Sequence, residues 1–168
     1  MKQKRDYTRA KHIAAVCGTV VLAALLQTTD GLFPKPFGAA AFLLVPLVVS
    51  CAMWESELPS LFYGLLAGLL WDCGNLRFNG HAIFLCLLGC VVSALIRRKM
   101  RNTLAVALVL CVPALLGFSL VSWAFSGQAA LRLLEYYLPS TVYTLLFVPL
   151  FYGLFGAIGR RWRVRSLA

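Results

Sequence analysis

The most informative stretch of the sequence reads Phe62-Tyr63-Gly64-Leu65-Leu66-Ala67-Gly68-Leu69-Leu70-Trp71-Asp72. It is almost wholly apolar, has Gly64 and Gly68 one helical turn apart, and ends in a carboxylate. Two glycines at this spacing make a flat strip that lets another helix backbone approach closely. The stretch therefore predicts a membrane helix whose close contact is with a neighbour in its own bundle or with a partner protein.

The composition of the whole chain is that of a membrane protein. Of its 168 residues, 61% are hydrophobic and 13% are charged, and the net charge is +10. Soluble domains are about 45–50% apolar and about 25% charged, and a chain of this length has too little interior to hide the excess. The composition excludes a soluble enzyme and a disordered or collagen-like chain. It favours positive charge that orients a membrane protein over nucleic-acid binding.

Six apolar runs follow one another with short connections, and no segment remains for a soluble domain. We predict an all-α, polytopic six-helix transmembrane bundle that forms one integral membrane domain over residues 1–168. The predicted spans are 12–29, 37–54, 58–72, 80–97, 103–125 and 138–159. The apolar part of the third span covers only about 21 Å of a hydrocarbon core about 30 Å thick.

Individual runs leave alternatives open. The basic start and first apolar run also describe a signal peptide, although the apolar runs downstream favour a retained helix. The third run could be re-entrant, which would place the two termini on opposite faces of the membrane. Pro46 lies inside the second run and is expected to kink it.

The distribution of Lys and Arg predicts the orientation. With six spans, both termini share a face with the loops after the second and fourth spans. Thirteen of the sixteen Lys and Arg residues fall on that face. Since short cytoplasmic loops carry the excess of basic residues, we expect both termini in the cytoplasm.

Asp72 is the main candidate for a polar site. It ends the short third run, so we expect it near the outer boundary of the hydrocarbon, where an ionisable side chain is costly and needs a partner. The partners close in sequence are Asn75, Arg77, Asn79 and His81. The arrangement is either a polar turn closed with Arg77 or a site for a ligand or partner. We expect His81 to hydrogen-bond at the interface rather than bind a metal, because no second His is nearby.

Small residues also recur at helical spacing in the first and last runs. They are Ala15, Thr19 and Ala23, a second row of Ala14 and Gly18, and the pair Gly153 and Ala157. This spacing is typical of closely packed helices, and we expect the contacts to be intramolecular. The six cysteines lie mostly in apolar runs and contain no CxxC, so we expect them to pack rather than bind metal.

The sequence contains no recognisable catalytic motif. It lacks HExxH, a Walker loop and GxSxG. Two His and six acidic residues leave little for hydrolytic chemistry. We therefore expect no enzymatic activity, no cofactor and no metal.

Two segments resemble the MreD family of rod shape-determining proteins. The run from Gly64 to Asp72, followed by Gly80, is similar to the family's glycine-rich third span, its closing aspartate and the glycine that opens the next helix. The run from Leu138 to Leu150, followed by a basic tail, is similar to the family's last span. The resemblance implies a non-enzymatic subunit of the cell-elongation machinery in the bacterial plasma membrane. Its partners would be MreC and, through MreC, MreB filaments, the synthase RodA and its transpeptidase partner.

The substrate-binding subunits of energy-coupling factor vitamin transporters have the same size and topology. On that interpretation, the row of Ala15, Thr19 and Ala23 would meet a transporter partner. Asp72 and His81, with the asparagines between them, would line an outward-facing vitamin pocket. Such a pocket needs several convergent polar groups, and the other outward loops supply few. This scarcity favours the cell-shape interpretation.

Overall fold

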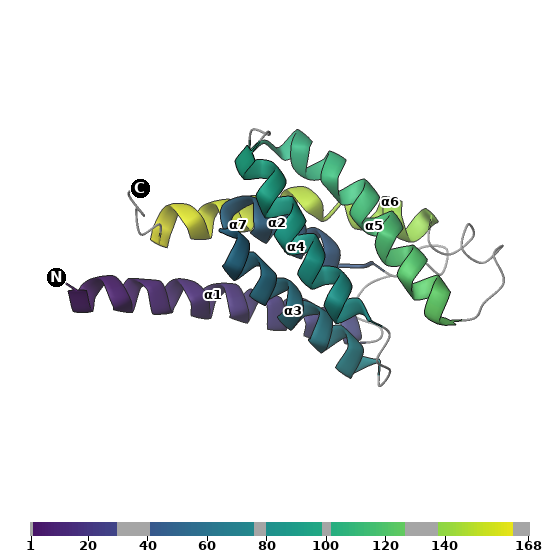
Figure 1. Cartoon of the computed structure of the whole chain (residues 1–168), viewed down its shortest axis with the longest axis horizontal. Helices are drawn as coiled ribbons and strands as arrows, with labels where there is room; N and C mark the ends of the chain where they lie inside the picture. The colour runs from purple at the N-terminus through teal and green to yellow at the C-terminus, as the bar shows by residue number, and fades with distance from the viewer. Residues whose placement is uncertain (1, 30–40, 76–79, 99–101, 127–137, 163–168) are drawn as a thin grey trace.

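The structure is a computed structural model that describes residues 2–29, 41–75, 80–98, 102–126 and 138–162 (Figure 1). Its helices are α1 (Lys2–Thr28), α2 (Leu44–Trp54), α3 (Glu57–Gly74), α4 (His81–Arg98), α5 (Leu104–Ser126), α6 (Leu138–Leu145) and α7 (Val148–Trp162). Every regular element in these residues is a helix, which confirms the all-α prediction. Within these described ranges, four stretches are long and apolar enough to cross a membrane: Ala10–Thr28, His81–Arg98, Leu104–Phe125 and Pro139–Arg160.

The second helix is much shorter than the predicted span 37–54. It has 11 residues, or about 16 Å, and residues 41–43 before it are not helical. Residues 37–40 lie outside the described part of the chain. Pro46 lies in the first turn of α2. The N–H groups of a first turn have no partner within the helix, so the N–H that proline lacks costs no hydrogen bond there. Pro46 therefore lies at the helix start, and the kink predicted inside a longer helix was wrong.

The short α2 helix is the centre of the bundle. Residues 44–53 are all buried, because α1, α3, α4, α5 and α7 all pack against the helix. The chain that enters α2 has no helical partner for its amides. Phe42 N–H donates to Thr144 Oγ1 at 2.9 Å, and Leu44 N–H donates to Gln27 Oε1 at 3.0 Å. Buried backbone at membrane depth needs such partners, since no water is available there.

The last predicted span, 138–159, is broken into α6 and α7. Pro149 has no N–H, and its ring clashes with the carbonyl four residues earlier, which is that of Leu145 at the end of α6. Leu146 N–H and Phe147 N–H instead donate to carbonyls three residues back, at 3.3 and 3.0 Å. The single continuous helix expected here is thus interrupted by a tight turn.

The third helix is longer than the predicted span 58–72. It has 18 residues, or about 27 Å, because Glu57, Cys73 and Gly74 extend it. Its apolar part is still shorter than the hydrocarbon core, and α3 is not among the four apolar stretches named above. The helix α2 is shorter still.

Backbone contact between α3 and α4 depends on three glycines. A Cβ atom on Gly64 or Gly68 would overlap the backbone of α4, and one on Gly89 of α4 would lie 2.6 Å from the carbonyl oxygen of Ser60. Real Cβ atoms do not approach other atoms this closely. The glycine strip predicted from the sequence therefore contacts a neighbour in the same chain.

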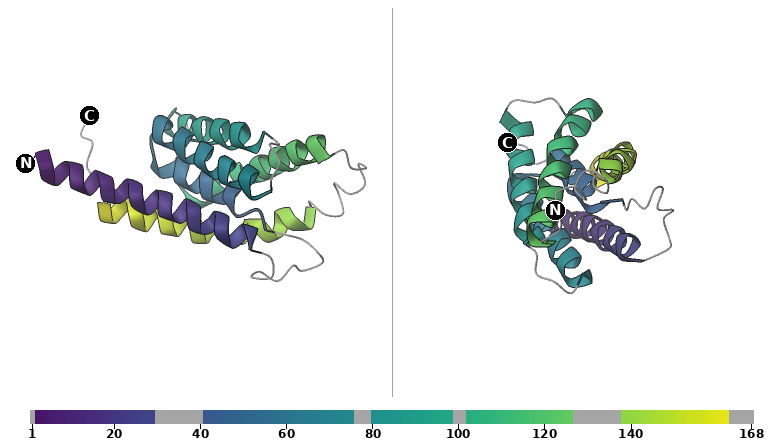
Figure 2. Two further views of the ribbon diagram at one scale, coloured as in Figure 1. Left: turned by 90° about the horizontal axis from the view of Figure 1, so that it is seen from below. Right: turned by 90° about the vertical axis from the view of Figure 1, so that its right-hand side faces the viewer.

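The outer flank of the bundle is formed by α1 and α7. These two helices lie side by side and run past the ends of α2–α5 (Figure 2). The first residues of α1 and the last residues of α7 lie at the same end of the molecule (Figure 1).

Substituting Gly68 with Ala should lower the thermal stability of the protein in lipid nanodiscs, because the new methyl group meets the backbone of α4. Gly153→Ala is the matched control, since a Cβ at Gly153 has nothing within 4 Å. Alanine is favoured over glycine inside a helix by about 1 kcal/mol, so the control should be neutral or slightly stabilising. Equal melting temperatures for the two variants would contradict the close α3–α4 contact.

Candidate functional site

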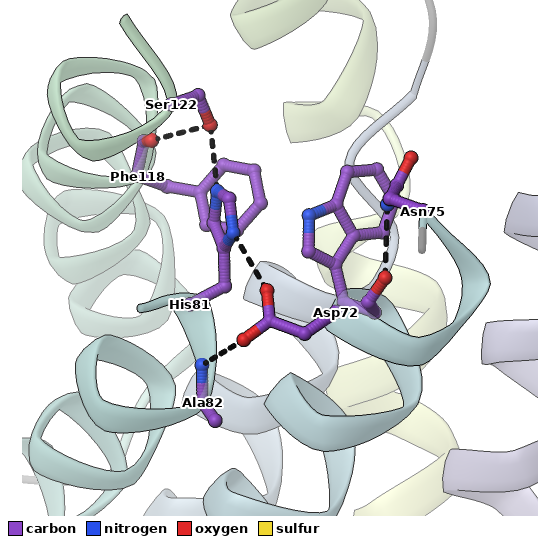
Figure 3. Close-up of polar contacts among 7 residues, drawn as sticks. Asp72, Asn75, His81, Ala82, Phe118 and Ser122 are labelled. Carbon is purple, nitrogen blue, oxygen red and sulfur yellow. Dashed lines mark hydrogen bonds and ion pairs between the residues drawn. The ribbon is translucent and has the colours of Figure 1, made fainter. Parts of the chain in front are cut away.

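A buried polar pair joins the end of α3 to the start of α4. His81 Nδ1 lies 3.0 Å from Asp72 Oδ1, and the two residues are only 2% and 3% exposed. The second carboxylate oxygen accepts from Ala82 N–H at 3.4 Å (Figure 3). Gly80, just before α4, has φ 72°, a left-handed conformation that favours glycine. The start of α4 thus places His81 and the N–H group of Ala82 beside the carboxylate of Asp72.

A third helix contributes Ser122 to this polar chain. His81 Nε2 lies 2.9 Å from Ser122 Oγ, and Ser122 Oγ donates to the carbonyl of Phe118 at 2.9 Å. The carboxylate, the imidazole and the serine hydroxyl thus form one continuous chain of hydrogen bonds across α3, α4 and α5.

Aromatic rings enclose the imidazole. The ring centroid of Phe118 lies 4.8 Å from that of His81, and the centroid of Trp71 lies 6.0 Å away. Phe42, in the chain that enters α2, packs on Phe118 at 5.2 Å. The rings shield the pair from solvent and strengthen its attraction, because the local dielectric constant is low.

The order Asp–His–Ser matches the relay of serine hydrolases, in which the imidazole accepts the serine proton as a general base. Here Ser122 Oγ also bonds to the carbonyl of Phe118 in its own helix. The chain of hydrogen bonds ties α3, α4 and α5 together.

The other residues predicted at this site have different positions. Asn75 Nδ2 donates to the carbonyl of Trp71 at 2.9 Å, and Asn75 is exposed and bonded away from Asp72. Arg77 and Asn79 lie outside the described residues. His81 hydrogen-bonds to Asp72, as expected, and it does so from a buried position inside the bundle. Ser122 was missed, although a polar residue late in the fifth apolar run was a usable signal.

The small-residue rows divide between two environments. Ala23 is buried and Ala15 and Thr19 are half-buried, with Thr19 Oγ1 donating to the carbonyl of Ala15 at 2.8 Å. A Cβ atom added at Gly18 or Gly153 would instead have no atom within 4 Å. The first row therefore faces the bundle, and the expectation of intramolecular packing is wrong at these two glycines.

A second polar cluster lies at the end of the bundle where the termini are. His12 Nε2 of α1 is 3.1 Å from Glu55 Oε1, between α2 and α3. Ser93 Oγ of α4 donates to the carbonyl of Glu55 at 3.0 Å. Burial raises the pKa of Glu55, although the positive charges of His12 and Arg97 oppose this shift. Glu55 thus ties α1 and α4 to the connection between α2 and α3.

Removing either member of the buried pair should lower stability by about 1–3 kcal/mol, because the remaining polar group loses its partner. We expect Asp72→Ala and Asp72→Ala/His81→Ala to have similar melting temperatures, since the double variant removes both groups. Asn75→Ala, at the exposed side of the same turn, is the control and should change stability little. Strictly additive losses would contradict a direct Asp72–His81 interaction.

The raised pKa of Glu55 has a consequence for pH dependence. The folded protein holds this proton more tightly than the unfolded chain, so the contribution of Glu55 to stability falls as pH rises above about 4. Glu55→Gln cannot titrate and should flatten this part of the profile of melting temperature between pH 4 and 8. Glu57→Gln, at an exposed neighbouring position, should leave the profile unchanged. An unchanged slope in Glu55→Gln would overturn the assignment.

The chain was also compared with known families, proteins and structures. It matches no protein-family model, no curated protein and no solved structure. The function must therefore be inferred from the residues that end α3 and begin α4, from the buried polar chain and from the distribution of charge.

Proposed function

We propose that this chain is a non-enzymatic membrane subunit of the bacterial cell-elongation machinery, similar to MreD, with six spans and cytoplasmic termini. In this role it would hold MreC in the plasma membrane and, through MreC, connect MreB filaments with RodA and its transpeptidase partner. The helical architecture and the four apolar stretches in the described residues that are long enough to cross a membrane support a multi-pass membrane protein. The remaining support comes from the first of the two segments that resemble MreD.

The main support for the proposal is the structural role of four residues in the first MreD-like segment. Gly64 and Gly68 bring the backbones of α3 and α4 together, Asp72 bonds to the start of α4, and Gly80 provides the left-handed turn between them. These four residues of the first MreD-like segment thus all help to build one closely packed α3–α4 hairpin. A rigid hairpin suits a scaffold, whose partners would bind to the exposed faces of the other helices.

The arrangement of the termini supports the proposed topology. The start of α1 and the end of α7 lie at the same end of the molecule (Figure 1), as an even number of crossings requires. Thirteen of the sixteen basic residues belong to this end in the six-span arrangement, and such an excess marks the cytoplasmic side. On this proposal, the Asp72–His81 pair lies toward the outer face.

The hydrogen bonds of the polar residues favour the scaffold over a vitamin-binding subunit. Asp72 and His81 bond to each other, and Asn75 bonds to the backbone of Trp71. These groups have few hydrogen bonds left for a ligand, whereas a vitamin pocket needs several free convergent groups.

Affinity purification of the tagged full chain from its native membrane should recover MreC and the synthases. Gly64→Leu/Gly68→Leu should lose that recovery because the α3–α4 hairpin cannot close, whereas Asn75→Ala should retain it. Normal recovery with the glycine variant would count against the hairpin as the basis of the scaffold. Recovery of ATPase subunits and a bound vitamin in place of MreC would support the transporter alternative.

A further inference from the structure

The chain of hydrogen bonds through Asp72, His81 and Ser122 is most accessible at Ser122. Asp72 and His81 are buried, whereas Ser122 is half-buried. His81 Nε2 lies 2.9 Å from Ser122 Oγ, and His81 Nδ1 lies 3.0 Å from Asp72 Oδ1 on the other side of the ring (Figure 3). A nucleophile within hydrogen-bond reach of a base, with the base oriented by a third group, is the arrangement that activates a serine.

The imidazole of His81 is held in one orientation. The carboxylate of Asp72 bonds to the ring through one oxygen and accepts from Ala82 N–H at 3.4 Å through the other. The ring of Phe118 packs against the imidazole with 4.8 Å between their centroids. Nε2 is therefore kept directed at Ser122 Oγ. The Ser122 hydroxyl can turn its proton toward Nε2 or toward the carbonyl of Phe118, 2.9 Å away, because a hydroxyl rotates to suit its acceptors.

Ser122 lies near the level of phospholipid ester groups when α5 spans the membrane. The helix has 23 residues, or about 34 Å, which slightly exceeds a hydrocarbon core about 30 Å thick. Ser122 is four residues before its end at Ser126, or about 6 Å along the helix axis. Phospholipid esters lie between the hydrocarbon and the charged headgroups. A lipid beside the last turns of α5 therefore presents an ester carbonyl close to Ser122.

Apolar side chains next to Ser122 suit an acyl chain. Phe125, three residues further along α5, is 60% exposed, and a Cβ atom on Gly80 would lie 3.5 Å from its ring. Phe125 thus covers the turn that leads into His81. Leu120, on the other side of Ser122 in the sequence, is also exposed. Apolar surface of this kind favours contact with hydrocarbon over contact with water.

We propose that Ser122 is an acyl-acceptor site that takes one fatty acyl group from an ester-linked phospholipid. Ser122 Oγ attacks the ester carbonyl carbon while its proton passes to His81 Nε2. The bond between that carbon and the glycerol oxygen then breaks, and Nε2 returns the proton to this oxygen. The products are an ester of Ser122 and a lysophospholipid. Because α4 begins at His81, the positive end of its dipole favours the negative charge that develops on the carbonyl oxygen.

The reaction ends at the acylated serine. Hydrolysis of the Ser122 ester would need water at the carbonyl, and the aromatic and lipid surroundings of the site keep water away. One acyl group is therefore taken up per chain, without turnover. The inference goes beyond the proposed scaffold role and does not depend on the membrane partners.

The first test measures the reaction of the wild-type chain in phosphatidylcholine nanodiscs with a fluorophosphonate probe, which labels activated serines. Peptide mass spectrometry should find the label at Ser122, and Ser122→Ala should remove it. Ser119→Ala is the matched control and should keep full labelling, because Ser119 bonds to the carbonyl of Leu115 at 2.8 Å rather than to His81. Absence of the label from Ser122 in the wild-type chain would overturn the proposal.

Variants of the other two residues test their roles in labelling. His81→Gln removes the base and should lower the labelling rate about a hundredfold. In His81→Ala, free imidazole should restore part of the labelling, which an unfolded chain would not allow. Asp72→Asn should lower the maximal labelling rate and leave the probe concentration for half-maximal rate unchanged, because Asp72 positions the imidazole without touching the probe. Labelling of His81→Gln at the wild-type rate would contradict an activated serine.

The acyl donor is tested with two lipids that share a headgroup. Phosphatidylcholine with a labelled acyl chain should transfer the label to Ser122 and release an equal amount of lysophosphatidylcholine. Ether-linked phosphatidylcholine has no ester and should transfer nothing. Fluorophosphonate labelling without transfer from the ester lipid would reject the phospholipid donor and overturn the proposal. Clear acyl transfer combined with failure to recover MreC would reject the proposed complex alone.

Discussion

Polar groups at the depth of the hydrocarbon can be satisfied only by other groups of the protein, and this requirement organises the bundle. The chain that enters α2 carries backbone amides with no helical partner. Thr144 of α6 and Gln27 of α1 accept two of them. The same requirement draws Asp72, His81 and Ser122 together from three helices. Apolar helices have little preference for any one packing arrangement in lipid. At both places, a polar side chain determines how the helices lie against one another.

The glycine contact and the buried Asp72–His81 hydrogen bond depend on each other. Gly68 packs against the backbone of Ala82, and Asp72 follows Gly68 by one helical turn. Because the two backbones touch at Gly68, the carboxylate of Asp72 comes within reach of Ala82 N–H and the imidazole of His81. A bulkier residue at position 68 would separate the helices and leave the carboxylate without its partners.

The sequence predicted those features that depend on neighbours in the chain. Apolar runs indicated the helices, and Asp72 could be matched with His81 because only a turn separates them. Ser122 is 41 residues from His81, and Thr144 is 102 residues from Phe42, so their roles depend on the packing of distant helices. The start of α2 was missed because the residues before Leu44 are as apolar as those after it. The break before α7 has a local cause, Pro149, but Pro113 lies inside the unbroken helix α5, so a proline in an apolar run does not by itself predict a break.

The enclosure of α2 has a consequence for how the protein is made. An 11-residue helix with buried residues on every side has no stable place in lipid before its neighbours exist. Two of those neighbours, α5 and α7, are synthesised well after α2 leaves the ribosome. The enclosure of α2 can therefore be completed only after α5 and α7 have been made.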